Sequence, residues 1–233
     1  MTVLTMDTSG PICSAAILRD GRILGERMAE SLRNHSVQAM AMVEGLLADC
    51  ALSLDQIDVF AAVLGPGSFT GIRIGVSAIK ALAMAAGKPC VGVDALEALA
   101  AGLAGYEGVL CPIIDARAGQ AYTAQFRGYP PERLTEDEAV RMDEALAHMA
   151  QTGARYVFVG DGVATLGARI RDALGDRAIF PPPHQLPLRA SAACALAERR
   201  ATQGQTTGYA DLRPLYVKAS QAEREEQERR SRG

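Results

Sequence analysis

The same plan of strands and turns occurs twice in this chain, and this repetition constrains the fold more than any other feature of the sequence. An apolar strand at 3–6 ends in Asp7 and a turn of small residues, and two strands joined by an Asp-Gly turn follow. An apolar strand at 110–114 likewise ends in Asp115 and a small-residue turn, after which a strand at 120–126 returns. Alternating helices and strands follow both hairpins. We interpret the repetition, which is one of element order and not of residue identity, as a duplicated α/β unit.

A strand, a hairpin and alternating helices, given twice, resemble the plan of the actin-like (ASKHA) architecture. In that architecture, aspartate-containing turns of two lobes contact nucleotide phosphates. We predict an α/β fold of this two-lobed, duplicated class with a shortened second lobe. The first lobe is expected over residues 1–104, with 191–203 packing back against it, and the second over 105–190. Glutamate and arginine without apolar residues predict a disordered tail over 221–233.

Strong local signals delimit the central elements. The continuous apolar run at 59–64 predicts a strand covered on both faces. A glycine-rich turn at 65–71 follows, and its hydroxyl residues can cap the next helix, which is expected to end at Gly87. In the second half, the pattern predicts a helix over 136–151.

The glycine-rich turn Gly65-Pro66-Gly67-Ser68-Phe69-Thr70-Gly71 is the most informative stretch. A phosphate-binding P-loop requires a lysine that this stretch lacks, and the dinucleotide pattern fails because Thr70 occupies its last glycine position. Free backbone N–H groups at the start of the following helix could bind an anion. Alternatively, the glycines only allow a tight turn and a close helix approach, which is the interpretation that we favour.

The turn Asp7-Thr8-Ser9 also has two interpretations. It could be a degenerate phosphate loop of nucleotide type, with hydroxyls on the phosphate, or a simple turn in which a side chain bonds its own backbone. From residue type alone, the simple turn is favoured. The five cysteines include no C-x-x-C pair, and the three histidines are dispersed, so no metal site is expected.

Charge and hydropathy exclude several classes of function. Lys and Arg number 24 against 27 Asp and Glu, a net charge of −3 without a basic stripe, so the chain is not expected to hold nucleic acid alone. The most apolar helical stretch, 72–86, contains Arg73 and Lys80 and is shorter than the ~20 residues of a membrane span. No basic region precedes Asp7, and we expect a cytoplasmic protein.

The helix expected over 36–51 carries more apolar surface than one sheet can bury. Met40 and Val43 lie on one arc and Met42 and Leu46 on another, whereas a surface helix needs a stripe of only ~100°. The excess predicts a second partner, inside or outside the chain. If it is outside, the helix after the glycine-rich turn completes the surface. The expected interface residues are His35, Met40, Val43, Leu47, Gly71, Gly75, Ala78 and Leu82.

Several stretches together resemble the TsaB family, also called YeaZ. They are Met6-Asp7-Thr8-Ser9, Arg33-x-His35-Ser36, the run from Gly65 to Gly75, the run from Val91 to Ala98, Ile114-Asp115-Ala116-Arg117, and Pro214-Leu215-Tyr216-Val217-Lys218. The resemblance implies a non-catalytic paralogue of TsaD, the subunit that transfers a threonylcarbamoyl group to N6 of an adenosine in tRNA (t6A). It also implies a TsaD-type catalytic subunit and a TsaE-type ATPase as partners, a homodimer when alone, contact with tRNA only through the complex, and no membrane.

TsaD-like proteins carry two metal-binding histidines where this chain has Ala95 and Leu99, neither of which can ligate a metal. We therefore expect no catalytic residue, no metal and no cofactor. Two other functions stay open at this point. A small actin-like ATPase or sugar-kinase-like enzyme would use Asp7, Thr8 and Ser9, and titration with ATP and Mg²⁺ would reveal it. A metallopeptidase would contain stoichiometric metal.

Overall fold

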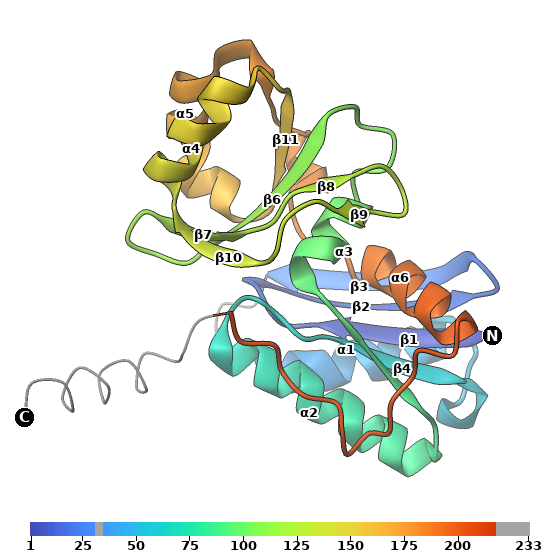
Figure 1. Ribbon diagram of the computed structural model, residues 1–233. Helices are drawn as coiled ribbons and strands as arrows, with labels where there is room; N and C mark the ends of the chain where they lie inside the picture. The colour runs from blue at the N-terminus through green and yellow to red at the C-terminus, as the bar shows by residue number, and fades with distance from the viewer. Residues whose placement is uncertain (31–34, 218–233) are drawn as a thin grey trace, which may run out of the picture.

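The computed structural model describes residues 1–30 and 35–217, with the backbone alone for residues 35 and 36. Two lobes, each built around a β-sheet, lie one above the other in Figure 1. The first sheet, in the order β3-β2-β1-β4-β5, contains β1 (Thr2–Asp7), β2 (Ile12–Arg19), β3 (Arg22–Glu30), β4 (Val59–Val63) and β5 (Cys90–Val93). The second, in the order β10-β7-β6-β11-β12, contains β6 (Val109–Asp115), β7 (Gln120–Thr123), β10 (Glu138–Arg141), β11 (Tyr156–Val159) and β12 (Ala178–Ile179), and β8 (Phe126–Arg127) pairs with β6 and β9 (Glu132–Arg133).

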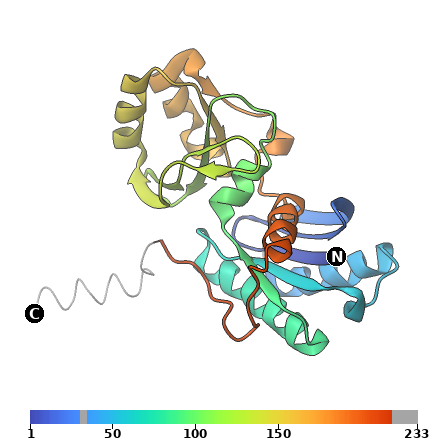
Figure 2. The same cartoon turned by 45° about the vertical axis from the view of Figure 1, so that its right-hand side comes forward.

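The helices flank these sheets. They are α1 (His35–Asp49), α2 (Phe69–Ala86), α3 (Ala95–Ala101), α4 (Met142–Thr152), α5 (Gly162–Leu174) and α6 (Ala190–Thr202). Helices α1 and α2 cover the face of the first sheet that is turned away from the second lobe, whereas α6 covers the other face (Figures 1 and 2). Helix α3 lies between the lobes and contacts both α6 and β6.

The two sheets share one topology. Strand β1 pairs antiparallel with β2 and parallel with β4, and β6 pairs in the same way with β7 and β11. The outer strands correspond as well, β3 to β10 and β5 to β12. This agreement confirms the duplicated α/β plan predicted from the repeated aspartate turns. The lobe boundaries near residues 104 and 190 stay a prediction, and the tail 221–233 lies outside the described residues.

Helix α2 has the ends that its sequence predicts. The Ser68 side chain accepts a hydrogen bond from the Gly71 amide at 3.2 Å, and Gly87 ends the helix in the left-handed conformation with φ 64°. With 18 residues, α2 is longer than the apolar stretch predicted, and by length and composition it could cross a membrane. One apolar face of α2, which includes Ile72 and Ile79, is instead buried against the first sheet.

The helix predicted over 136–151 is wrong in its first turn and a half. Residues 138–141 form β10, which pairs antiparallel with β7 from Glu138 opposite Thr123 to Arg141 opposite Gln120, and α4 begins only at Met142. The segment Glu-Ala-Val-Arg has a helix-forming composition, but pairing with the open edge of β7 overrides that local preference. Strand β10 is therefore the counterpart of β3.

A segment without helix or strand, residues 203–217, runs back along α2 from its C-terminal end to its N-terminal end (Figure 1, red). Thr207 and Cys90 exchange two backbone hydrogen bonds of 2.8 Å, and Lys80 of α2 donates to the carbonyl oxygens of Ala210 and Leu212. The Leu215 amide then donates to a carbonyl at the end of β4. We call this segment the C-terminal strap.

We expect Leu212→Ala to lower the free energy of unfolding by about 2–5 kcal/mol, because Leu212 is buried in the core that α1 and α2 form with the first sheet. Leu215→Ala makes the same chemical change at an exposed site of the strap and should cost about 0.5 kcal/mol or less. Urea unfolding followed by circular dichroism measures both. Equal losses for the two variants would contradict a structural role for the strap.

Candidate partner surface and lobe cleft

Both lobes present the same aspartate turn at the end of their first strand. Asp7 accepts a hydrogen bond from the Ser9 amide at 2.8 Å, and Asp115 accepts one from the Arg117 amide at 2.7 Å. In each case a side-chain oxygen satisfies the backbone two residues later. In the second lobe, Asp161 accepts from the Asp115 amide at 3.0 Å. The turns that would face a nucleotide in an actin-like enzyme are therefore present in both halves.

The glycine-rich turn packs tightly on the turn of the first lobe. The Thr8 hydroxyl donates to the Gly71 carbonyl oxygen at 2.7 Å, and the Ser68 amide donates to the Ser9 carbonyl oxygen at 2.7 Å. A Cβ atom on Gly71 would lie 2.0 Å from the carbonyl oxygen of Thr8, and one on Gly75 would lie 2.4 Å from the Thr8 hydroxyl. These glycines therefore allow the close approach of α2, as we favoured from the sequence.

A cavity of about 190 Å³ lies between the aspartate turn of the first lobe and residues Gly160 and Asp161 of the second. Asp7 and Asp161 carry the only charges among the described residues that line it, and burial raises the pKa of Asp161. Apolar side chains from both lobes form most of the wall, among them Pro11, Ile12, Leu99, Ile114, Leu186 and Leu188. The lining thus differs from a polyphosphate site, where basic side chains or backbone amides converge on the ligand.

The described residues contain no group of three or more His, Cys, Asp or Glu side chains that could hold a metal ion. Ala95 and Leu99, at the positions where TsaD-like proteins have histidines, are both buried in α3. His148 is exposed on α4, and His184 is exposed in a short turn of the second lobe.

The predicted interface residues divide into three groups. Met40 is exposed, and three residues at the α1–α2 seam are half-buried: Leu47, Ala78 and Leu82. Val43 is 1% exposed and packs under α1, so it is a core residue, and its place on a partner surface was wrong. Gly71 and Gly75 are buried against Thr8 and do not form a ridge for another helix. The His35 side chain lies outside the described residues.

The surface that α1 and α2 do expose was only partly predicted. On α1 it contains Val37 (67% exposed), Met40 (36%), Ala41, Glu44, Ala48 and Asp49, and on α2 it contains Thr70, Arg73, Ser77, Ala81, Met84 (58%) and Ala85. We call these residues the α1–α2 surface. Helical spacing places Val37, Met40 and Ala41 on one arc, which is a signal that the sequence contained. Glu44, Asp49 and Arg73 are its charged residues, and Asp49 is paired with Arg27 of β3. The rest of the surface is apolar or small.

A family model described as "TsaD: tRNA N6-adenosine threonylcarbamoyltransferase" matches residues 23–225. The tRNA threonylcarbamoyladenosine biosynthesis protein TsaB of Bacillus subtilis is 32% identical over 96% of both chains. The protein of the same name in Escherichia coli is 29% identical over 94% of this chain and 95% of its own.

Solved structures agree on the fold. A crystal structure of an uncharacterized protein from Pseudomonas aeruginosa, described as similar to peptidase YEAZ, has a TM-score of 0.79 at 24% identity and covers 93% of this chain and 99% of its own. The ROK hexokinase of Thermus thermophilus has a TM-score of 0.51 at 12% identity and covers 86% of this chain and 100% of its own, which shows the actin-like fold alone. With a family model matched over most of its length and a relative of 32% identity aligned over nearly all of it, the chain belongs to the TsaB (YeaZ) family.

Proposed function

We propose that this protein acts in t6A biosynthesis as a non-catalytic subunit that binds and activates a TsaD-type catalytic subunit. Its relatives in Bacillus subtilis and Escherichia coli carry the name of that pathway. A TsaE-type ATPase is the further partner, and tRNA is contacted only through the assembled complex. When no TsaD-type subunit is present, a second copy of the chain takes its place.

The observation that carries this proposal is the α1–α2 surface. Val37, Met40 and Met84 are large apolar side chains left exposed on one side of the first lobe. Methionine repacks at low cost, so such a surface suits two related but unequal partners. A TsaD-type subunit has the same fold plan, and a contact between equivalent helices of two paralogues follows pseudo-two-fold symmetry.

The cleft supports an accessory role and not a catalytic one. The Thr8 hydroxyl is occupied by its hydrogen bond to Gly71, and apolar side chains form most of the wall between the lobes. Ala95 and Leu99 offer no metal ligand at the positions where TsaD-like proteins have histidines. The described residues of the cleft therefore offer no metal site that would activate a threonylcarbamoyl donor.

Reconstitution tests this proposal. Threonylcarbamoyl transfer to tRNA is measured with the TsaD-type and TsaE-type subunits of the same organism, with and without this chain, and sedimentation velocity follows complex formation. We expect a complex with the TsaD-type subunit and transfer only when this chain is added. Transfer or peptide hydrolysis by the chain alone, or full transfer without it, would overturn the proposal.

A further inference from the structure

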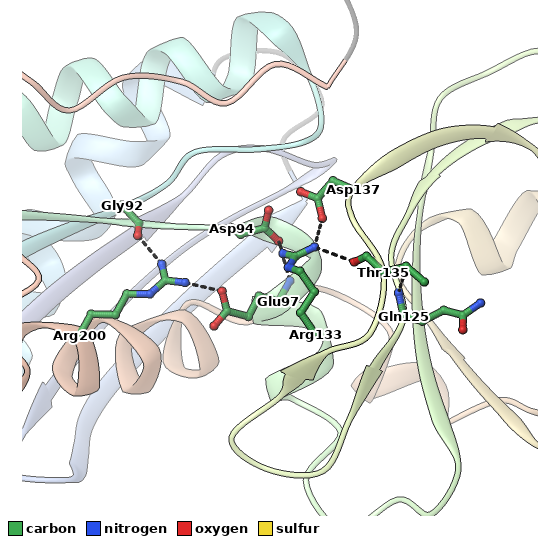
Figure 3. Close-up of polar contacts among 8 residues, drawn as sticks. All are labelled: Gly92, Asp94, Glu97, Gln125, Arg133, Thr135, Asp137 and Arg200. Carbon is green, nitrogen blue, oxygen red and sulfur yellow. Dashed lines mark hydrogen bonds and ion pairs between the residues drawn. The ribbon is translucent and has the colours of Figure 1, made fainter.

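Five charged side chains meet where the second lobe contacts α3 (Figure 3). They come from parts of the chain that are far apart in sequence, so no local sequence pattern predicts the cluster. Asp94 and Glu97 lie at the start of α3, Arg133 lies in β9, Asp137 precedes β10, and Arg200 comes from α6. The cluster thus joins the helix between the lobes to the outer strands of the second lobe.

Arg133 holds two carboxylates at once. Its guanidinium lies 3.4 Å from the Asp94 carboxylate and forms a close ion pair with Asp137, and both of these acidic side chains are nearly buried, 11% and 12% exposed. The guanidinium also stacks on the Phe126 ring at 4.7 Å and donates to the Thr135 carbonyl oxygen. Arg133 is therefore fixed from within the second lobe, and Asp94 is the first-lobe group that it contacts.

Asp94 is itself held firmly. Its carboxylate caps α3 by accepting the Glu97 amide at 2.7 Å. Glu97 pairs with Arg200, and Arg200 also donates to the Gly92 carbonyl oxygen at 2.5 Å. These contacts fix the start of α3 to α6 and β5. The interaction between Arg133 and Asp94 therefore connects the second lobe to the body of the first lobe.

The two carboxyl groups of Asp94 and Asp137 share the single positive charge of Arg133, so the group carries excess negative charge when both are ionised. Burial, followed by the hydrogen bond with Asp137 and the negative charge there, raises the pKa of Asp94 to about 8. A proton held on Asp94 leaves one negative charge facing the one positive charge of Arg133. When Asp94 ionises, a second negative charge is left at a boundary that excludes most solvent.

We propose that Asp94, Arg133 and Asp137 form a latch that holds the second lobe closed on the first without a ligand between them, and that loss of the proton from the carboxyl pair weakens it. The other charged groups around the pair are Glu97 from α3 and its partner Arg200 from α6. Strand β8 contributes the uncharged Phe126. In this protein, side chains then do what a bridging nucleotide does in an actin-like enzyme.

The direction of the pH dependence follows from the closed and open states. In the open state Asp94 is solvated and has its ordinary pKa of about 3.9. The closed state binds one proton more than the open state between that value and about 8, so rising pH favours opening. The ratio of open to closed molecules is expected to rise up to about tenfold per pH unit through the neutral range. It levels off above about pH 8, where both states are ionised.

Hydrogen exchange measured by mass spectrometry on the full chain tests the latch, because it detects rare open states. Rates are corrected for the intrinsic pH dependence of exchange. In the wild type, protection averaged over the two boundary segments, residues 95–101 of α3 and 132–137 of the second lobe, should fall with pH as the open-to-closed ratio rises. Asp94→Asn keeps the cap and the neutral form of the side chain, so its boundary protection should not change with pH. Amides of β4 report global unfolding and should be unaffected by either change.

Arg133→Met removes the positive charge and keeps an apolar side chain against Phe126, so boundary protection should be low at every pH. Arg127→Met, at an exposed arginine of the neighbouring strand β8, is the matched control and should behave as the wild type. Indistinguishable pH profiles for the wild type and Asp94→Asn would overturn the latch, even if Arg133→Met failed to fold. Wild-type protection in Arg133→Met, or an equal loss in β4, would overturn it as well.

Discussion

The double variant Val37→Glu/Met40→Glu is expected to bind a TsaD-type subunit at least about a hundredfold more weakly than the wild type. Both side chains are exposed on one arc of α1, so glutamate is compatible with the free fold and with a helix. In a complex, the new carboxylates are buried without partners, and an uncompensated buried charge costs about 3–5 kcal/mol, where ~1.4 kcal/mol is already tenfold. Sedimentation velocity measures both this complex and the homodimer.

A matched control places the same two charges on the other lobe. Ala147 and Ala150 are exposed on α4 with the same spacing of three residues, and Ala147→Glu/Ala150→Glu should leave both assemblies unchanged. Circular dichroism establishes that each variant is folded. If the α1 variant is folded and associates with wild-type affinity, the α1–α2 surface is not the partner surface.

Gly71→Ala is expected to lower the free energy of unfolding by about 3–5 kcal/mol. Its new methyl group would lie 2.0 Å from the Thr8 carbonyl oxygen, which is backbone and cannot turn away. Helix α2 must then shift from the turn, and overpacking costs about 1–3 kcal/mol. The shift also breaks the 2.7 Å hydrogen bond from the buried Thr8 hydroxyl, and an unsatisfied buried group costs about 1–3 kcal/mol more.

The control for this variant is Gly10, in the turn between β1 and β2 that follows Thr8. A Cβ on Gly10 would meet no atom within 4 Å, and its φ is not positive, so Gly10→Ala should leave stability unchanged or slightly raised. Chemical unfolding of the two variants gives the comparison. If the two variants had similar free energies of unfolding, α2 could move away from the aspartate turn without loss of stability, and the prediction would be wrong.

The duplicated fold could be predicted because its signals are local. Asp7 and Asp115 each end an apolar strand, and Ser68 and Gly87 mark the two ends of α2 by their own capping chemistry. Strand β10 could not be predicted from the sequence, because its composition favours a helix and only pairing with β7 makes it a strand.

The candidate surface was harder to predict, for a different reason. Helical spacing identifies apolar arcs of α1 but does not say which arc faces the sheet and which faces outward. Val43 and Met40 are both apolar, and the first lies in the core while the second is exposed. Gly71 similarly looks like a helix-packing glycine, whereas its contact is with Thr8, which the sequence places far away. The latch is a still longer-range feature, because Arg133 reaches Asp94 only once both lobes have formed.

The position of α6 and the C-terminal strap has a consequence for synthesis on the ribosome. The second sheet is formed from one continuous stretch, 109–179, and can fold as soon as that stretch has emerged. The strands of the first sheet are all made by residue 93, but its lobe is completed only by α6 and the strap, which are made last. Until then, the face of β1 and β2 that carries Val3, Ala16 and Leu18 lacks its cover of α6. This apolar face is made first and stays uncovered until α6 has been synthesised, so we expect chaperones that bind exposed apolar surface to act on the first sheet during translation.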